Sequence, residues 1–391
     1  MLPNRFSYAN IHERNTNVRV RWTYREDVTE MSQKLRAGVI GATGYVGQRF
    51  ISLLDNHPWF TCSAVAASPR SAGKTYEQAV EGRWKIDAPM PEYVKNMIVF
   101  GLDHLDAFLD EVDFVFCAVD MPKEQIREFE ETIARHEVPV ISNNSAHRKT
   151  PDVPMIIPEI NPEHSEVIAF QKKRLGTTRG FIAVKPNCSI QSYVPALHPL
   201  KDFGVKKVFV ATYQAISGAG KTFTDWPDMV NNMIPYIGGE EEKSEQEPLK
   251  IWGRLENGLI VNSESPIISA QCYRVAVAEG HTAAVSVLFD KKPSVDEIKS
   301  RWADFVGEAV RQELPSAPNP FIQYLEEDTR PQPKFDASYE NGMGITIGRL
   351  RDDNIFDYKF TCLSHNTLRG AAGGGVLTAE LLTKYGYISN R

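Results

Sequence analysis

Beyond residue 35, short apolar segments in the first half of the chain alternate with amphipathic ones. Residues 37–40, 62–67, 113–119 and 138–142 have the composition of buried strands, and residues 122–136 have the pattern of a helix between the last two. Strands that alternate with helices indicate a parallel, doubly wound sheet. We therefore expect an α/β domain in this half.

The second half has more strand-like segments and fewer helices between them. Five segments alternate or cluster residues that favour β-structure, at 208–215, 269–277, 283–289, 345–350 and 356–362. They predict an α+β domain with a mostly antiparallel sheet. Residues 312–336 carry five prolines and are expected to form a long excursion. The glycine-rich residues 370–375 predict a loop that leads into a helix over 376–382.

Residues 1–34 differ from the rest of the chain and are expected to be a partly ordered extension. They contain no apolar stretch of about 7–15 residues, so a secretory signal is not expected. Acidic side chains among the arginines disfavour a transit peptide (Glu13, Glu26, Asp27, Glu30). Residues 18–24 alternate apolar and polar side chains, which predicts one half-buried strand.

Composition and charge narrow the class of protein. At 391 residues, 42% apolar and 24% charged, the chain has the length of two domains and the composition of an ordinary soluble enzyme. Its longest apolar run, residues 114–119, is far shorter than a membrane span of about 20 residues, and a net charge of −6 disfavours nucleic-acid binding. Five cysteines without a CxxC pair argue against disulfides and metal sites, and favour a reducing compartment, the cytoplasm.

A glycine-rich turn follows the first apolar strand. Gly41, Gly44 and Gly47 have the spacing G-x-x-G-x-x-G and lie between that strand and an amphipathic helix. In this context, such a loop favours a Rossmann-type dinucleotide-binding domain, since the glycines let a pyrophosphate approach the helix N-terminus. The alternative is a purely structural turn. The candidate cofactor-binding residues in this loop are Gly41, Thr43, Gly44, Tyr45, Val46 and Gly47.

The residues after the second strand indicate which dinucleotide binds. An NAD site has an acidic residue at this point, to bind the ribose hydroxyls. Here the strand is followed by Ser68, Arg70 and Ser71, which are suited to a 2′-phosphate. NADP(H) is therefore favoured over NAD, and the alternative is a solvated basic loop.

One cysteine has the surroundings of a nucleophile. Cys188 follows Pro186 and Asn187, and a proline at this point suits the first turn of a helix. We expect the helix N-terminus to lower the pKa of the Cys188 thiol and so favour the thiolate. The other cysteines lie in apolar strands and are expected to be small buried residues (Cys62, Cys117, Cys272, Cys362). His281, after a glycine and before a strand, is a candidate base, although a structural histidine is the alternative.

Several motifs, taken in order, resemble the aspartate-β-semialdehyde dehydrogenase family from residue 35 to the end of the chain. They are the glycine loop, Pro186-Asn187-Cys188-Ser189, Gln214 in Ala-Thr-Tyr-Gln-Ala-Ile-Ser-Gly, Arg274 seven residues before His281, and Ser-His-Asn-Thr-Leu-Arg-Gly-Ala-Ala-Gly-Gly near the end. The last motif resembles the branch found in fungi and archaea. Lys185 departs from the family, which often has Asn or a small residue there.

The resemblance implies NADPH-dependent reductive dephosphorylation of β-aspartyl phosphate to aspartate semialdehyde, on the route to lysine, threonine and methionine. It implies that Cys188 forms a thioester, which hydride then reduces. The remaining roles that it implies are His281 as acid/base, Gln214 orienting the acyl group, Asn187 at the oxyanion, Arg274 on the α-carboxylate, Glu240 on the α-ammonium, Arg148 and Lys243 on the phosphate, and Ser217, Gly218 and Asn366 at the nicotinamide. For Glu240 and Lys243, at i and i+3 on one helix, a solvated ion pair is the alternative.

The expected organisation is an extension (1–34), an NADP-binding domain (35–185, completed by 365–391) and a catalytic and dimerisation domain (186–364). The resemblance implies a homodimer or homotetramer that acts on a small molecule. Three alternatives stay open: an acyl-CoA reductase of the malonyl-CoA type, a catalytically silent NADP-binding paralogue, and an N-acetylglutamyl-phosphate reductase. The last is disfavoured because its substrate has no ammonium for Glu240.

Overall fold

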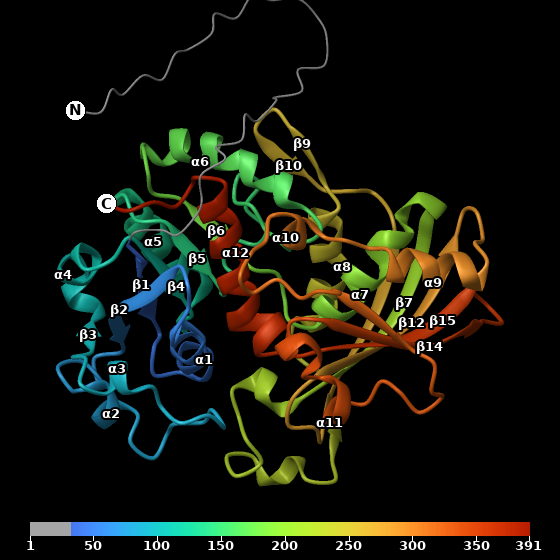
Figure 1. Cartoon of the computed structure of the whole chain (residues 1–391), viewed down its shortest axis with the longest axis horizontal. Helices are drawn as coiled ribbons and strands as arrows, with labels where there is room; N and C mark the ends of the chain where they lie inside the picture. Colours follow the sequence, from blue (N-terminus) through green and yellow to red (C-terminus); the bar gives the residue numbers. More distant parts are fainter. Residues whose placement is uncertain (1–32) are drawn as a thin grey trace, which may run out of the picture. The chain divides into compact units, whose positions relative to one another are not determined.

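The first sheet is parallel throughout. The computed structural model describes residues 33–391, and the strand predicted over 18–24 lies outside this range. Six strands lie side by side in the order β3-β2-β1-β4-β5-β6 (Figure 1). Their bounds are Leu35–Ile40 (β1), Phe60–Ala67 (β2), Phe100–Gly101 (β3), Phe114–Cys117 (β4), Val140–Ser142 (β5) and Ile182–Val184 (β6). The predicted doubly wound sheet is confirmed.

Helices flank this sheet and explain why its central strand β4 is apolar and buried along its whole length. They are α1 (Tyr45–Leu54), α2 (Tyr76–Ala79), α3 (Glu92–Lys95), α4 (Leu105–Asp110), α5 (Lys123–Arg135) and α6 (Ile168–Leu175). The rings of Phe50 on α1 and Phe116 on β4 stack at 4.4 Å, and both side chains are fully buried. A central strand covered on both faces has no solvent side, so the polar alternation of a half-exposed strand is absent.

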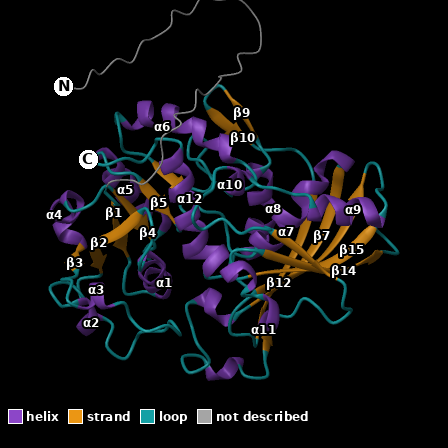
Figure 2. Cartoon of the chain, viewed as in Figure 1, coloured by secondary structure: helices purple, strands orange, loops and turns teal. Residues whose placement is uncertain are grey.

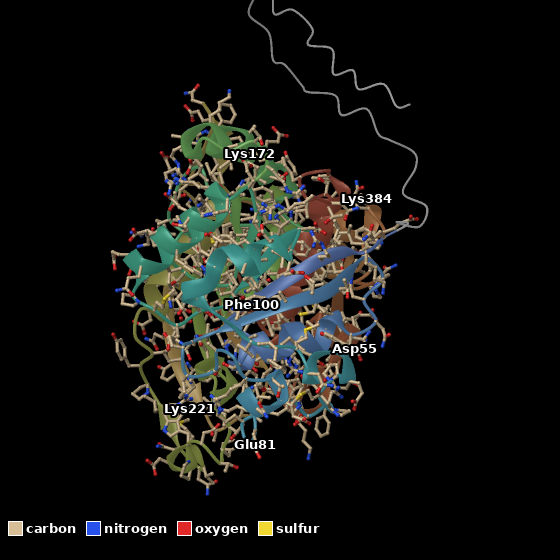
Figure 3. All side chains as sticks on the ribbon, turned by 90° about the vertical axis from the view of Figure 1, so that its left-hand side faces the viewer. Asp55, Glu81, Phe100, Lys172, Lys221 and Lys384 are labelled. Carbon is tan, nitrogen blue, oxygen red and sulfur yellow. The ribbon has the colours of Figure 1, made fainter. Side chains whose placement is uncertain are left out.

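The C-terminal helix α12 (Gly373–Lys384) returns to the first sheet, where it packs against α1 and β5. Figure 3 labels Lys384 at its end, together with Lys172 on α6 and Phe100 on β3. The glycine-rich segment before it was predicted to be a loop, and this was wrong: Leu368–Ala372 forms a π-helical turn that continues into α12. Close packing accounts for these glycines, since a Cβ on Gly375 would lie 2.9 Å from the ring of Phe50.

The second sheet has seven strands in the order β13-β14-β15-β12-β7-β11-β8. Their bounds are Val205–Gln214 (β7), Met233–Ile234 (β8), Ile267–Val275 (β11), His281–Phe289 (β12), Ile322–Leu325 (β13), Ile345–Asp352 (β14) and Tyr358–Ser364 (β15). Figure 2 labels β7, β12, β14 and β15 of this sheet. Neighbouring strands are antiparallel except for β13–β14 and β7–β11, which are parallel. The mostly antiparallel prediction is thus confirmed, but the sheet is mixed. The excursion predicted over 312–336 supplies one edge strand, β13, and the short helix α11 (Pro333–Asp336).

Helices cover one face of this sheet. Three of them pack against its strands: α7 (Ile190–Leu197), α8 (Glu240–Ile251) and α9 (Val295–Ala303). Along β11, buried residues alternate with Ile267, Ser269 and Gln271, which are exposed. The remaining α-helix and strands of the described residues are α10 (Glu308–Arg311) and a hairpin of β9 (Arg254–Glu256) and β10 (Leu259–Val261). The exposed side chains of β11 therefore belong to a sheet face without helices.

Candidate active site

The structure brings Cys188 and His281 together. Cys188 lies in the turn between β6 and α7, two residues before α7 begins, and His281 is the first residue of β12. The Sγ of Cys188 is 3.4 Å from the Nε2 of His281. A thiol and an imidazole from different parts of the chain at this distance are the arrangement of an activated nucleophile.

The hydrogen bonds of His281 define its tautomer. Its Nδ1 accepts a hydrogen bond from the backbone N–H of Ala215 at 3.1 Å, so the ring proton is assigned to Nε2, which faces the sulfur. Burial, followed by the charge of Arg274, holds the pKa of His281 well below its usual value. The imidazole is therefore neutral and presents an N–H to Cys188.

The thiol of Cys188 does not have the lowered pKa that the sequence predicts. Burial, followed by the charge of Glu240, raises the pKa of Cys188, while Lys185, Arg148 and Arg274 lower it. The expected position before a helix is confirmed, but desolvation of the thiolate outweighs the helix N-terminus here. The other four cysteines are free and buried, as predicted.

Glu240, the first residue of α8, is the centre of a polar cluster. Its carboxylate accepts hydrogen bonds from Asn187 Nδ2 (3.0 Å to each oxygen) and Gln214 Nε2 (3.2 Å), and pairs with Lys243 Nζ at 2.7 Å. Burial opposes its ionisation, but the charge of Lys243 and these hydrogen bonds lower the pKa of Glu240. Since the Oδ1 of Asn187 also accepts from Ser189 N, the Asn187 amide is engaged with the protein instead of facing the thiol. Glu240 and Lys243 do form an ion pair, but Glu240 is buried, so it is not the solvated pair that the sequence left as an alternative.

Glu247, which the sequence analysis did not select, connects Arg148 to the Cys188 turn. Arg148 Nη1 pairs with Glu247 Oε1 at 3.0 Å, and Glu247 Oε2 accepts from the backbone N–H of Asn187 at 2.6 Å. The Nε of Arg148 is buried and has no hydrogen-bond partner within the described part of the chain. Glu247 follows Glu240 by two helical turns on the same face, so the i, i+7 spacing is a signal that could have found it.

Arg274 reaches the same place from β11. Its side chain is buried, and Nη1 donates to the carbonyl oxygen of Ala215 at 2.7 Å. A Cβ on Gly218 would lie 2.7 Å from this Nη1 and 3.0 Å from Nε2 of His281. A side chain at position 218 would therefore displace the guanidinium of Arg274.

A second polar cluster links the thiol region to the glycine loop. Asn366 donates to Ser217 Oγ at 2.8 Å, and Ser217 Oγ donates to Glu279 Oε2 at 3.0 Å. The other oxygen of Glu279 accepts from the phenol of Tyr45, at the start of α1, over 2.5 Å. Glu279 could not be predicted as a site residue, because no local sequence pattern distinguishes it from other glutamates. Through it, the candidate nicotinamide residues contact the helix after the glycine loop.

The glycine loop fits a dinucleotide phosphate. Gly41 has a φ of +81°, and a Cβ there would lie 2.2 Å from the carbonyl oxygen of Ala118. Gly44 is the N-cap of α1 and no side chain caps the helix, so the N–H groups of the first turn remain available to an anion. Tyr45, Val46 and Gly47 form that turn, and the carbonyl of Thr43 accepts from Gln48 Nε2 at 3.0 Å.

The residues selected for NADP(H) follow β2 directly. Ser68 and Arg70 are exposed, while Ser71 is buried and its N–H donates to the carbonyl of Ser68 at 2.9 Å. Arg70 follows the end of β2, and β2 pairs with β1, the strand that leads into the glycine loop. This is where the ribose of a bound dinucleotide lies in such folds.

Residues 33–391 lack the features of a metal centre and of a membrane span. No group of three or more His, Cys, Asp or Glu side chains in this range is placed to hold a metal ion. None of the helices described in this range has the length and apolar character needed to cross a membrane.

A doubly wound sheet with a glycine loop, together with a cysteine–histidine pair, is the architecture of an NAD(P)-dependent oxidoreductase. Residues 36–168 match the NAD-binding domain of semialdehyde dehydrogenases, and residues 197–369 match their dimerisation domain. Curated aspartate-semialdehyde dehydrogenases are 38–43% identical to this chain over most of its length, so the chain belongs to the aspartate-semialdehyde dehydrogenase family.

Individual relatives agree with this assignment. The chain is 43% identical to the aspartate-semialdehyde dehydrogenase of Archaeoglobus fulgidus, over 89% of this chain and 97% of the relative. It is 42% identical to that of Saccharomyces cerevisiae, over 90% and 98%. The crystal structure of aspartate semialdehyde dehydrogenase with NADP from Candida albicans superimposes with a TM-score of 0.82 at 36% identity, and covers 91% of this chain and 100% of that one. The predicted similarity to fungal and archaeal members is confirmed.

Proposed function

We propose that this chain catalyses the NADPH-dependent reduction of β-aspartyl phosphate to aspartate semialdehyde, with release of phosphate. The observation that carries the proposal is the 3.4 Å approach of Cys188 Sγ to His281 Nε2, within reach of the charges of Arg274, Arg148 and Glu240. The cysteine sulfur attacks the acyl carbon, a C–S bond forms, and the C–O bond to phosphate breaks with its electron pair on the phosphate. After hydride transfer to the thioester carbon, the neutral imidazole of His281 can donate its Nε2 proton to the carbonyl oxygen, which gives a thiohemiacetal on Cys188. When the C–S bond breaks, that proton returns to His281, and the aldehyde and the Cys188 thiolate are released.

The charges around the thiol match a substrate with more negative than positive charge. The buried or half-buried cations are Arg148, Lys185, Lys243 and Arg274, and the carboxylates among them are Glu240 and Glu247. The positive excess suits an acyl phosphate that also carries a carboxylate. In this proposal the fork of Arg274 binds the α-carboxylate, Glu240 the α-ammonium, and Arg148 and Lys243 the phosphate.

Two site residues are assigned through their contacts. The side-chain amides of Gln214 and Asn187 both donate hydrogen bonds to the carboxylate of Glu240 and hold it in place. We assign Gln214 to the acyl group, as expected from the sequence. For Asn187 we propose a positioning role on Glu240 and on the start of α7, because its amide is already engaged.

NADP(H) is the cofactor of this chain, and when bound it supplies or accepts the hydride. Its pyrophosphate is proposed to lie on Gly41, Thr43, Gly44, Tyr45, Val46 and Gly47, its 2′-phosphate on Ser68, Arg70 and Ser71, and its nicotinamide beside Ser217, Gly218 and Asn366. The uncapped N-terminus of α1 supports the first of these positions.

We propose the domain boundaries expected from the sequence, with 35–185 and 365–391 binding the cofactor and 186–364 carrying the thiol chemistry. A homodimer is proposed to form through the face of the second sheet that has no helices. A shallow hollow on that face is lined by side chains that include Phe209, Ile267 and Ile355, a partly apolar surface suited to a second copy. A tetramer is the other oligomer to test, by light scattering, and cytoplasmic location stays a prediction.

Absorbance at the NADPH band tests the activity. Aspartate semialdehyde, phosphate and NADP should give NADPH, while malonyl-CoA with NADPH should give no change. Turnover of malonyl-CoA alone would identify an acyl-CoA reductase, and binding of NADP without turnover of either substrate would identify a silent paralogue. Turnover of N-acetylglutamate semialdehyde in preference to aspartate semialdehyde would contradict the role of Glu240.

A further inference from the structure

Tyr76 is a buried tyrosine whose hydroxyl reaches the glycine loop. It is the first residue of α2 and follows the N-cap Thr75, which forms a capping box with Gln78. The side chain of Tyr76 is fully buried, and its hydroxyl donates to the carbonyl oxygen of Ala42 at 2.9 Å. Burial raises the pKa of Tyr76, so the phenol keeps its proton and acts as a donor. One carbonyl of the loop is thus held by a side chain from another segment.

This contact orients a whole peptide group of the loop. The carbonyl of Ala42 and the N–H of Thr43 belong to one planar trans peptide and point in opposite directions. Since the carbonyl faces Tyr76, the N–H of Thr43 points away from it. The N–H groups of Gly41 and Ala42 both donate to the carbonyl of Ala66, at 2.9 and 3.1 Å. Within residues 33–391 the N–H of Thr43 has no acceptor, so it remains available to a ligand.

Two further N–H groups beside it are also available. Those of Tyr45 and Val46, in the uncapped first turn of α1, have no acceptor in the described part of the chain. The carbonyl of Thr43 is held by Gln48, whose Nε2 donates to it at 3.0 Å. Side chains therefore hold the carbonyls of Ala42 and Thr43, while successive N–H groups are left to bind an anion.

We propose that Tyr76 is a positioning residue for NADP(H), because its hydroxyl keeps the carbonyl of Ala42 turned away from the pyrophosphate and the N–H of Thr43 turned toward it. This deepens the proposed function, since it rests on the pyrophosphate lying on the glycine loop. Without the hydroxyl, the buried carbonyl of Ala42 loses its partner, and the peptide group can turn. Cofactor binding must then turn it back, so the affinity falls with the fraction of molecules in the binding-competent arrangement.

The test is NADPH binding by Tyr76→Phe, measured by fluorescence titration without substrate. The ring stays in the core, so the variant should fold, with a lower midpoint of thermal unfolding because one hydrogen bond is lost. The Kd for NADPH should rise about 3- to 30-fold. The Kd for 2′-AMP, measured from its competition with NADPH, should stay within about twofold, because this ligand carries the 2′-phosphate but no pyrophosphate.

Tyr93→Phe is the matched control. Tyr93 lies on α3, which packs against α2, and its hydroxyl donates to the carbonyl of Ile51 at 2.7 Å (Figure 1). Ile51 is in the second half of α1, beyond the glycine loop. This variant should lose thermal stability in the same way and keep its Kd for NADPH. Both variants lose a tyrosine hydroxyl that donates to a backbone carbonyl, so a difference in NADPH affinity separates a positioning role from a structural one.

An unchanged Kd for NADPH in Tyr76→Phe, or an equal rise in Tyr93→Phe, would overturn the assignment. Equal weakening of NADPH and 2′-AMP would also overturn it, because the effect would then not lie at the pyrophosphate. Binding requires no turnover, so the result is independent of the proposed activity. If the predicted Kd values are found and the unaltered protein does not turn over aspartate semialdehyde, the role of Tyr76 is supported and the activity is refuted.

Discussion

The phenol of Tyr45 donates a hydrogen bond to the carboxylate of Glu279 over 2.5 Å, and so connects α1 with the segment that leads into His281 on β12. The second oxygen of Glu279 accepts from Ser217. One carboxylate therefore holds a residue of the glycine loop and a residue proposed to contact the nicotinamide. Glu279 therefore connects the start of α1 with the segment that precedes His281.

Replacing Glu279 should weaken cofactor binding more than chemistry. In Glu279→Ala the side chains of Tyr45 and Ser217 lose a charged acceptor, as do those of Arg49 and Thr367, and such a hydrogen bond contributes about 1.5–3 kcal/mol. We expect the Kd for NADPH, measured by fluorescence titration, to rise about 10- to 100-fold, while kcat at saturating NADPH stays within about threefold. The exposed Glu264→Ala is the control. An unchanged Kd would show that this contact plays no part in cofactor binding.

Arg274→Lys should lose most of its catalytic efficiency although the positive charge is kept. The guanidinium is held by the carbonyl of Ala215 at 2.7 Å, and lysine cannot keep this contact and also offer two donors to a carboxylate. The expected loss in kcat/KM for aspartate semialdehyde is about 2–4 kcal/mol, or about 30- to 900-fold. With 3-aminopropanal, which lacks the α-carboxylate, the loss should be small. Equal losses in kcat/KM with both aldehydes would show that Arg274 does not bind the α-carboxylate. The control is Arg301→Lys, at an exposed position.

Arg70→Ala should change the choice of dinucleotide. If the exposed guanidinium binds the 2′-phosphate, its removal should raise KM for NADP about 10- to 100-fold and leave KM for NAD nearly unchanged. Steady-state kinetics with both cofactors measure the ratio, and Lys95→Ala serves as a control for loss of a surface cation. A parallel change in the two KM values would place the 2′-phosphate elsewhere.

Buried neutral histidines should make the fold acid-sensitive. Burial lowers the pKa of His164, His198 and His365 to about 4, whereas the unfolded chain binds the same protons near pH 6.5. Below pH 6.5 the unfolded state therefore binds more protons than the folded state, so stability is full above 6.5 and falls toward pH 4. Each group contributes a slope of about 1.4 kcal/mol per pH unit in this window.

His198→Gln isolates one of these contributions. The Nδ1 of His198 is buried without a hydrogen-bond partner in the described structure, so the ring contributes little beyond its packing on Phe305. Urea unfolding at pH 8, 6 and 5 should show a smaller loss of stability on acidification in the variant. Parallel curves for the two proteins would mean that His198 titrates normally.

Much of the fold could be predicted because its signals are local. The apolar segment that became β1 leads into Gly41, and the periodic helix after it needed no distant information. Cys188 and His281 were selected from their immediate surroundings and from the resemblance. The sign of the pKa shift at Cys188 was not predictable, because burial by segments distant in the chain outweighs the local helix start.

The features that could not be predicted depend on contacts between residues that are distant in the sequence. The amide of Asn187 is occupied by Glu240, and the backbone of Asn187 by Glu247, neither of which is near it in sequence. The glycine run around Gly375 was predicted as a loop because glycine disfavours isolated helices, yet here it allows α12 to approach Phe50. The parallel pairing of β13 likewise depends on partners that the local pattern does not reveal.

Cys188→Ala separates chemistry from cofactor binding. The thiol and the glycine loop are different elements, so the variant should lose turnover and keep its Kd for NADPH within about threefold of the unaltered protein. Fluorescence titration and the absorbance assay measure the two quantities on the same sample. Residual activity above a trace would mean that the reaction does not need the thiol.

The most direct test of the covalent route is the reaction of aspartate semialdehyde and NADP without phosphate. Hydride transfer should then proceed once, to the Cys188 thioester, and stop, because no phosphate is present to release the acyl group. The account predicts a burst of about one NADPH per chain in stopped flow, together with an acyl adduct on the Cys188 peptide. Absence of both burst and adduct, in a protein that turns over fully once phosphate is added, would contradict it.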